Sequence, residues 1–305
     1  MKLPVSIPLP AARPVVLRRR QGFSLVEVLL VISLLALIVL ALMDVFSSTQ
    51  RAFRASVTQS DVMESSRAAM ELMTEDLRKM TPCYGKVDGT NVNFFSYYNG
   101  LLFGDAYYAP LVQSLPGTTT ERTNLLNYIY ILGRQNNQWI ATAYIVVNTN
   151  TSPLYPLYRY HAQISTTFPP GILSSNFLAL ANNQAWTNAA FSHLMDGVVH
   201  LVARPYDPNG TWMTNGYNPY MMPPAGAYFV APAYGEANCA FYSNALPAMV
   251  EIQLGVIEDR ALAKAEGLNG ASTYMASNYL SSQSGALHLF RQQVSIPNLD
   301  RSAYQ

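Results

Sequence analysis

Near the N-terminus, a glycine, the residue after it and one acid within an apolar run could take part in chemistry. Gly22 and Phe23 mark the change from a basic to an apolar sequence, and Glu27 is the only charged residue in positions 23–43. A carboxylate inside a membrane helix costs about 2.5 to 3.5 kcal/mol at the bilayer centre, so such residues usually have a partner. Cleavage between Gly22 and Phe23 would supply one, because an α-amine has an ordinary pKa of about 8 and is a cation at neutral pH.

The element that must position these residues is a membrane-spanning helix. Residues 23–43 are long and apolar enough to cross a hydrocarbon core of about 30 Å. The arginines at positions 18–20 precede this run and Asp44 follows it, which predicts a cytoplasmic N-terminus. A secretory signal would have a small-x-small cleavage site after the run, but residues 40–46 read LALMDVF. Cleavage is therefore expected before the run. The plainer interpretation of Glu27 is an interfacial acid near the positive end of the helix dipole.

The segment around the predicted cleavage site is similar to a known signal. Residues 21–27 read QGFSLVE and residues 28–31 read VLLV. This pattern resembles the class III signal of type IV pilins and type II secretion pseudopilins. The resemblance implies that a prepilin peptidase cuts after Gly22 and N-methylates Phe23. It also implies that Glu27 pairs with the terminal amine of a neighbouring subunit during assembly. The 22-residue leader, with four prolines, is longer than that of many major pilins.

A second stretch of helix is expected to follow the membrane span. Residues 44–81 contain no Gly or Pro, and apolar residues recur at helical spacing until Pro82 ends the pattern. We therefore expect one stalk helix, with residues 23–43 in the membrane and residues 44–81 exported. Residues 66–78 read SRAAMELMTEDLR, which resembles the end of the stalk helix in J-type minor pseudopilins and W-type minor pilins.

Residues 82–305 have a different composition and predict a β-rich globular domain. All 20 tyrosines and all three tryptophans lie in this part. Runs of β-branched and aromatic residues predict strands at 92–98, 126–132, 139–147, 156–164, 198–206, 248–257 and 286–296, and a short helix at 258–266. Stretches rich in Asn, Thr, Ser and Pro predict loops at 113–124, 148–153 and 207–225. The predicted fold class is α+β, a long N-terminal stalk helix packed against an antiparallel sheet.

Charge and motifs argue against nucleic-acid binding and against catalysis. Loss of residues 1–22 would remove five basic residues, so the formal net charge would change from +1 to −4. The predicted domain has nine basic residues scattered among eleven acidic ones, which does not form a basic stripe. The four histidines are scattered and none of the common catalytic or nucleotide-binding motifs is present. We therefore expect neither an enzyme nor a cofactor.

Two weaker candidates lie in the predicted domain. Cys83 and Cys239 are the only cysteines, and an oxidising compartment would permit a disulfide between them, although buried unpaired cysteines are common. Asp207 and Asn209 could offer oxygen atoms to calcium. A calcium ion needs six to eight oxygen ligands, however, and this loop lacks the rest of such a set. No other metal site is expected.

The resemblance implies a minor pilin-like structural subunit of a type II secretion pseudopilus or a related type IV filament tip. Its expected partners are other pilins or pseudopilins through residues 23–80, the prepilin peptidase, the inner-membrane assembly platform and the lipid bilayer. We expect a single-pass bacterial inner-membrane protein with a periplasmic C-terminal domain, or a filament subunit after assembly. The alternative is an anchored periplasmic binding or adhesion domain that is not assembled. Glu27 argues against this alternative, because an independent anchor has no use for an intramembrane acid.

Overall fold

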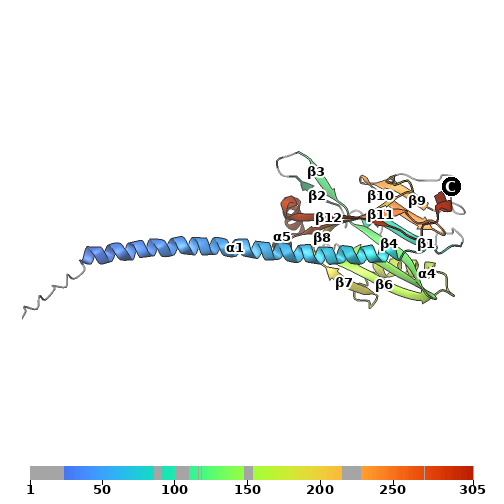
Figure 1. Ribbon diagram of the computed structural model, residues 1–305, viewed down its shortest axis with the longest axis horizontal. Coiled ribbons are helices and arrows are strands. Elements are labelled where there is room, and N and C mark those ends of the chain that lie inside the picture. The colour runs from blue at the N-terminus through green and yellow to red at the C-terminus, as the bar shows by residue number, and fades with distance from the viewer. Residues whose placement is uncertain are drawn as a thin grey trace, which may run out of the picture. The chain divides into compact units, whose positions relative to one another are not determined.

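The computed structural model describes residues 24–85, 91–100, 110–115, 117, 119–147, 154–214, 228–270 and 272–304. The predicted processing residues Gly22 and Phe23 and the loop at 148–153 lie outside the described residues. The chain divides into two compact units, residues 1–55 and 56–305, and the division falls within helix α1 (Leu25–Arg78). A long apolar helix followed by an antiparallel sheet domain confirms the predicted α+β class (Figure 1).

The sheets of the second unit are antiparallel throughout. The larger sheet has seven strands in the order β7-β6-β5-β4-β1-β10-β9 and the smaller has three in the order β12-β11-β8 (Figure 1). A separate hairpin joins β2 (Leu111–Ser114) to β3 (Glu121–Asn124). The strands of the seven-stranded sheet are β1 (Val92–Tyr98), β4 (Asn127–Gln135), β5 (Gln138–Val146), β6 (Leu157–Ser165), β7 (Phe191–Met195), β9 (Tyr228–Ala233) and β10 (Glu236–Tyr242). Those of the three-stranded sheet are β8 (Val198–Tyr206), β11 (Met249–Ile257) and β12 (Leu287–Ser295).

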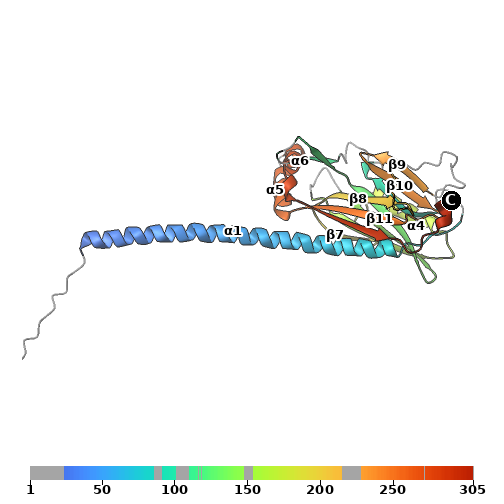
Figure 2. The same cartoon turned by 45° about the horizontal axis from the view of Figure 1, so that its top comes forward.

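The helices after α1 are short. The first, α4 (Gly171–Asn182), lies between β6 and β7 in the chain, while α5 (Asp259–Asn269) and α6 (Thr273–Ser281) lie between β11 and β12 (Figure 2). Single 3-10 turns follow at η1 (Ser284–Ala286) and η2 (Arg301–Tyr304). Helices α5 and α6 pack on each other, and α6 also contacts β2.

Two hydrophobic cores lie on opposite faces of the seven-stranded sheet. On one face, the last turns of α1 and the three-stranded sheet pack against it, with Met73, Leu77 and Phe241 among the fully buried side chains. On the other face, α4 covers a cluster of aromatic rings that includes Tyr130 and Phe177. Strand residues alternate between the two cores because successive side chains of a strand point to opposite faces. Tyrosines contribute to both cores, with Tyr144 in the first and Tyr130 and Tyr160 in the second.

A partly buried arginine connects the two sheets. Arg204 on β8 donates from Nε to Glu236 Oε2 on β10 at 2.6 Å and from a terminal nitrogen to Glu251 Oε1 on β11 at 3.2 Å. Its guanidinium also lies 4.6 Å from the ring centroid of Trp212. Hydrogen bonds to two carboxylates satisfy a charge that would be costly to bury alone. Arg204 thus fixes the position of the smaller sheet on the larger one.

Most predicted strands are present, but other elements were missed. The prediction of a loop at 113–124 is wrong in part, because β2 and β3 form a hairpin at its ends. Polar side chains stabilise this hairpin: Asn124 Nδ2 donates to Gln113 Oε1 at 2.8 Å, and Gln113 Nε2 donates to Leu280 O at 3.0 Å. Sequence analysis also did not predict α4, α6, β7, β9 and β10. The described start of the predicted loop at 207–225 is irregular, with one bridge between Tyr206 and Trp212.

A glycine allows two strands of the smaller sheet to approach each other. Gly255 on β11 lies opposite His200 on β8, and an added Cβ at Gly255 would lie 2.7 Å from the Cβ of His200. His200 is itself held in place, because its Nδ1 accepts a hydrogen bond from the backbone N–H of Leu125 at 3.1 Å. Burial, followed by the nearby charge of Arg122, lowers the pKa of His200 to about 3, so the ring is neutral at physiological pH.

We predict that Gly255→Ala lowers the free energy of unfolding of the full chain in detergent by about 1 to 3 kcal/mol, the usual cost of overpacking a core. Denaturant unfolding followed by tryptophan fluorescence measures this change. Gly267→Ala in α5 is the matched control, because an added Cβ there would meet no atom within 4 Å. Equal stability of the Gly255→Ala variant and the native chain would contradict the close approach of His200.

Candidate functional site

The N-terminal part of α1 positions Glu27, the predicted assembly residue. Ser24 precedes the helix and caps it: the backbone N–H of Glu27 donates to Ser24 Oγ at 3.2 Å and to Ser24 O at 3.0 Å. A serine at this position satisfies backbone N–H groups that have no partner within the helix. Glu27 therefore lies in the first turn, where the helix dipole favours a negative charge.

The side chain of Glu27 has no ion-pair partner among residues 24–85 or in the rest of the described chain. The side chains that surround it in sequence are apolar and exposed. A lone carboxylate on an apolar helix is stable in a bilayer only with a partner or near the interface. The arrangement therefore leaves a carboxylate available to a cation from outside the described part of the chain.

The apolar run of α1 is exposed along its whole length. Leu25 is 80% exposed and Met43 is 67% exposed, and the large side chains between them are exposed as well. Within the described residues, α1 is the one helix that is long and apolar enough to cross a membrane. An exposed apolar surface of this size is unstable in water. Lipid or other apolar helices must cover it.

The last turns of α1 meet a different environment, because they are packed on the sheet domain. Met70, Met73, Leu77 and Met80 are all buried against the first core. These residues follow the three- and four-residue spacing of one helix face, as the sequence predicts. The same helix thus carries an apolar surface that no described residue covers and, further along, an apolar face that the sheet domain covers.

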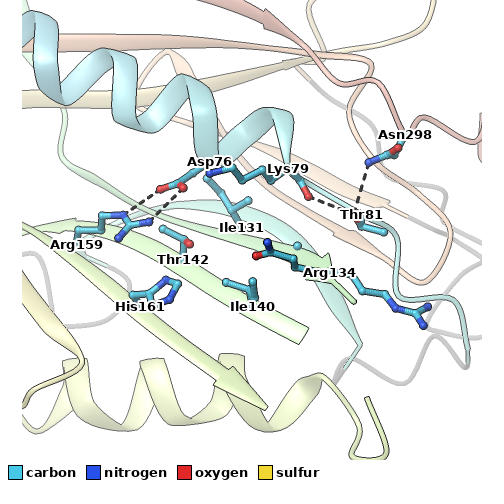
Figure 3. Close-up of a pocket in the computed structure, with 12 residues that line it drawn as sticks. Asp76, Lys79, Thr81, Ile131, Arg134, Ile140, Thr142, Arg159, His161 and Asn298 are labelled. Atoms are coloured by element: carbon cyan, nitrogen blue, oxygen red, sulfur yellow. Dashed lines mark hydrogen bonds and ion pairs between the residues drawn. The ribbon is translucent and has the colours of Figure 1, made fainter. Parts of the chain in front are cut away.

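A buried carboxylate anchors this end of the helix. Asp76 accepts two hydrogen bonds from Arg159 on β6: Arg159 Nε donates to Oδ2 at 3.0 Å, and a terminal nitrogen donates to Oδ1 at 3.1 Å (Figure 3). Tyr144 on β5 donates its hydroxyl to Oδ2 at 2.5 Å. The side chain of Asp76 is 6% exposed and that of Arg159 is 22% exposed. Burial and the adjacent Asp76 raise the pKa of Tyr144, so its hydroxyl remains a donor.

The chain after α1 stays in contact with the larger sheet. Thr81 N donates to Leu132 O at 3.0 Å, and Asn298 Nδ2 donates to Met80 O at 2.8 Å. A Cβ at Gly133 would lie 3.0 Å from Lys79 O, so a side chain at this position would push the helix end away from β4. These contacts and the Asp76 cluster were not found by sequence analysis. An arginine within the otherwise apolar and aromatic start of β6 was the available signal.

The structure describes both cysteines considered for a disulfide, and no bond joins Cys83 to Cys239 in it. Cys83 packs at the margin of the aromatic core, whereas Cys239 is buried in the core on the other face of the sheet. The backbone of the sheet separates the two side chains. Burial raises the pKa of Cys239 to about 12, so this thiol is an unreactive core residue.

The predicted calcium loop uses its carboxylate for its own backbone. Asp207 Oδ1 accepts from Asn209 N at 2.9 Å and from Thr211 N at 2.8 Å. In the part of the chain that the structure describes, no three His, Cys, Asp or Glu side chains come together in a group that could hold a metal ion. Asp207 and Asn209 therefore form a turn, and no further acidic ligand joins them there.

Comparison with known proteins identifies one short segment. A family model described as a prokaryotic N-terminal methylation motif matches residues 17–43. No curated protein matches the chain, and no solved structure matches it either. The match spans the basic flank, Gly22, Phe23, Glu27 and the apolar run, so the N-terminus carries a type IV pilin-like signal. Proteins with this motif are structural.

We predict that Asp76→Ala lowers the free energy of unfolding by about 3 kcal/mol, because it leaves the partly buried guanidinium of Arg159 without its partner. Denaturant unfolding of the full chain in detergent measures the loss. Glu75→Ala is the matched control, since Glu75 pairs with Lys79 on the exposed face of the same helix turn and its loss should have no measurable effect. Equal effects of the two substitutions would show that the cluster does not anchor α1.

Proposed function

We propose that the chain is a minor structural subunit of a type II secretion pseudopilus or a related type IV filament. In this proposal, the chain crosses the bacterial inner membrane once through residues 23–43, with its N-terminus in the cytoplasm and residues 44–305 in the periplasm. The prepilin peptidase cuts after Gly22 and methylates the amine of Phe23. The observation that carries the proposal is Glu27, an acid in the first turn of an exposed apolar helix that begins with a pilin-like signal.

The position of Glu27 supports a role in pairing with a terminal amine. Residues four apart lie on the same side of a helix, so the new N-terminus and Glu27 would share a face. The helix dipole favours the carboxylate at the N-terminal end of the helix but disfavours the positive charge of a terminal ammonium there. An ion pair between each ammonium and the Glu27 of a neighbouring subunit would offset this unfavourable interaction and would neutralise the carboxylate in the apolar surroundings. It also sets the axial position of one helix relative to the next.

The exposed apolar surface supports assembly through side-by-side helices. In the bilayer, lipid covers residues 25–43, and in a filament the equivalent surfaces of other pilins or pseudopilins replace the lipid. The buried anchor at Asp76 holds the exported domain at a fixed place on the helix. Force applied to the helix by an assembly platform in the inner membrane would therefore be transmitted to the domain.

Glu27→Ala is expected to leave membrane insertion and cleavage intact and to lower incorporation into filaments at least tenfold. The apolar run becomes more hydrophobic in this variant, so insertion has no reason to fail. Incorporation is measured by quantifying the subunit in filaments sheared from native host cells, against its amount in the membrane. Glu64→Ala is the matched control, because Glu64 is an exposed acid of the same helix outside the apolar run.

Normal incorporation of the Glu27→Ala subunit would remove the proposed pairing. Absence of the native chain from filaments, with all of it in the membrane, would instead favour an anchored periplasmic domain that is not assembled.

A further inference from the structure

Strand β12 presents an open edge of the smaller sheet. It lies at the end of the order β12-β11-β8 and pairs with β11 over all nine residues without a register shift. Within the described residues, no hydrogen bond reaches the backbone of β12 from any element other than β11. In an antiparallel pair, every second residue of an edge strand directs its N–H and C=O outward. The outer side of β12 is therefore a row of unpaired donors and acceptors.

The two edge strands of the larger sheet carry features that discourage pairing, whereas β12 has neither a proline nor a bulge. Strand β9 contains Pro232, which cannot donate a hydrogen bond, and β7 has only five residues and an irregular register. Proline, short length and bulges are the usual protection of an edge strand. Strand β12 reads LHLFRQQVS, with no proline or glycine. Its length and regularity suit it to accept another strand.

A groove runs between this edge and helix α1. Phe290, Arg291 and Gln292 of β12 form one wall, residues of α1 from Arg67 to Arg78 form the other, and the groove has a volume of about 550 Å³. Thr74 lies in the helix wall and is 4% exposed, and its hydroxyl oxygen has no hydrogen-bond partner among the described residues. This oxygen is covered by the chain, so the groups that a ligand in the groove could reach are the exposed side chains of the two walls.

Positive charge flanks the groove. Arg67 and Arg78 on the helix wall form no ion pair within the described chain. The wall also has two acids. Glu75 pairs with Lys79, and Glu71 forms no ion pair within the described chain. On the other side of the strand, Arg291 lies close enough to Arg122 to repel it. Partial burial and this repulsion lower the pKa of Arg122. A negatively charged partner would relieve the excess positive charge.

We propose that the groove between β12 and α1 binds an extended, acidic segment of a partner protein, which pairs with β12 as a fourth strand of the smaller sheet. Main-chain hydrogen bonds to β12 provide affinity, and alternate side chains of the segment lie against α1 and Arg291. Acidic side chains are selected by Arg67, Arg78 and Arg291. The proposal concerns residues 67–78 and 287–295 and does not depend on how the N-terminus is processed.

Photo-cross-linking in native membranes tests this proposal on the full chain. The photoreactive residue p-benzoylphenylalanine replaces Gln292 in the groove or, as a matched control, the exposed Gln138 at the start of β5. After irradiation, mass spectrometry maps the partner peptide. We expect an adduct at position 292 and none at position 138. The partner peptide should come from a different protein and contain at least two acidic residues within an extended segment of about eight.

Charge substitutions distinguish a specific partner from chance contact. Arg67→Gln combined with Arg78→Gln should lower the adduct yield at least tenfold, and Arg260→Gln combined with Arg301→Gln, two exposed arginines outside the groove, should not. Hydrogen exchange should also be slowed at alternate amides of residues 287–295 in the isolated adduct. Equal yields at positions 292 and 138, adducts only with lipid or a second copy of this chain, or a yield insensitive to both double substitutions would overturn the proposal.

Discussion

The apolar surface of residues 25–43 constrains everything else in this protein, because the described chain offers nothing to cover it. Each exposed leucine or isoleucine of this run would gain about 1.5 to 3 kcal/mol from burial, so the run cannot remain in water. Burial must come from a bilayer or from other helices. One acid, Glu27, is retained within that surface despite its cost. Both features fit the proposed pairing of this helix with other helices, in which a terminal amine meets Glu27.

The helix changes role along its length, and side-chain chemistry explains how. Up to Met43 the residues after Glu27 are uncharged, whereas beyond Asp44 charged and apolar residues alternate with the helical period. The later apolar stripe is buried by the sheet domain. In the same part of the helix, Asp76 accepts hydrogen bonds from Arg159 and Tyr144 of the sheet. A methionine and leucine stripe alone would allow the helix to slide or rotate on the sheet. The directional hydrogen bonds of Asp76 fix the position of the helix on the sheet.

Sequence patterns predicted those features that depend on local composition and failed on those that depend on distant contacts. The boundaries of β1 and β8 were predicted correctly, because runs rich in β-branched and aromatic residues are characteristic of strands. The hairpin of β2 and β3 was missed, since its strands are short and polar and are stabilised by Gln113 and Asn124. The Asp76–Arg159 pair joins residues 83 positions apart, and the arginine at the start of β6 does not by itself indicate which acid it contacts. The sequence could not show whether Cys83 and Cys239 form a disulfide for the same reason. The face of the sheet on which each cysteine lies depends on contacts between distant segments.

The proposed pairing of Glu27 requires cleavage between Gly22 and Phe23, because this cleavage would create the terminal amine that Glu27 is expected to bind. Mass spectrometry of the N-terminal peptide, from the chain purified out of its native membrane, measures this most directly. We expect a mature chain that begins with N-methylated Phe23. An intact Met1, or a cut after residue 40 that removes the apolar run, would contradict the account.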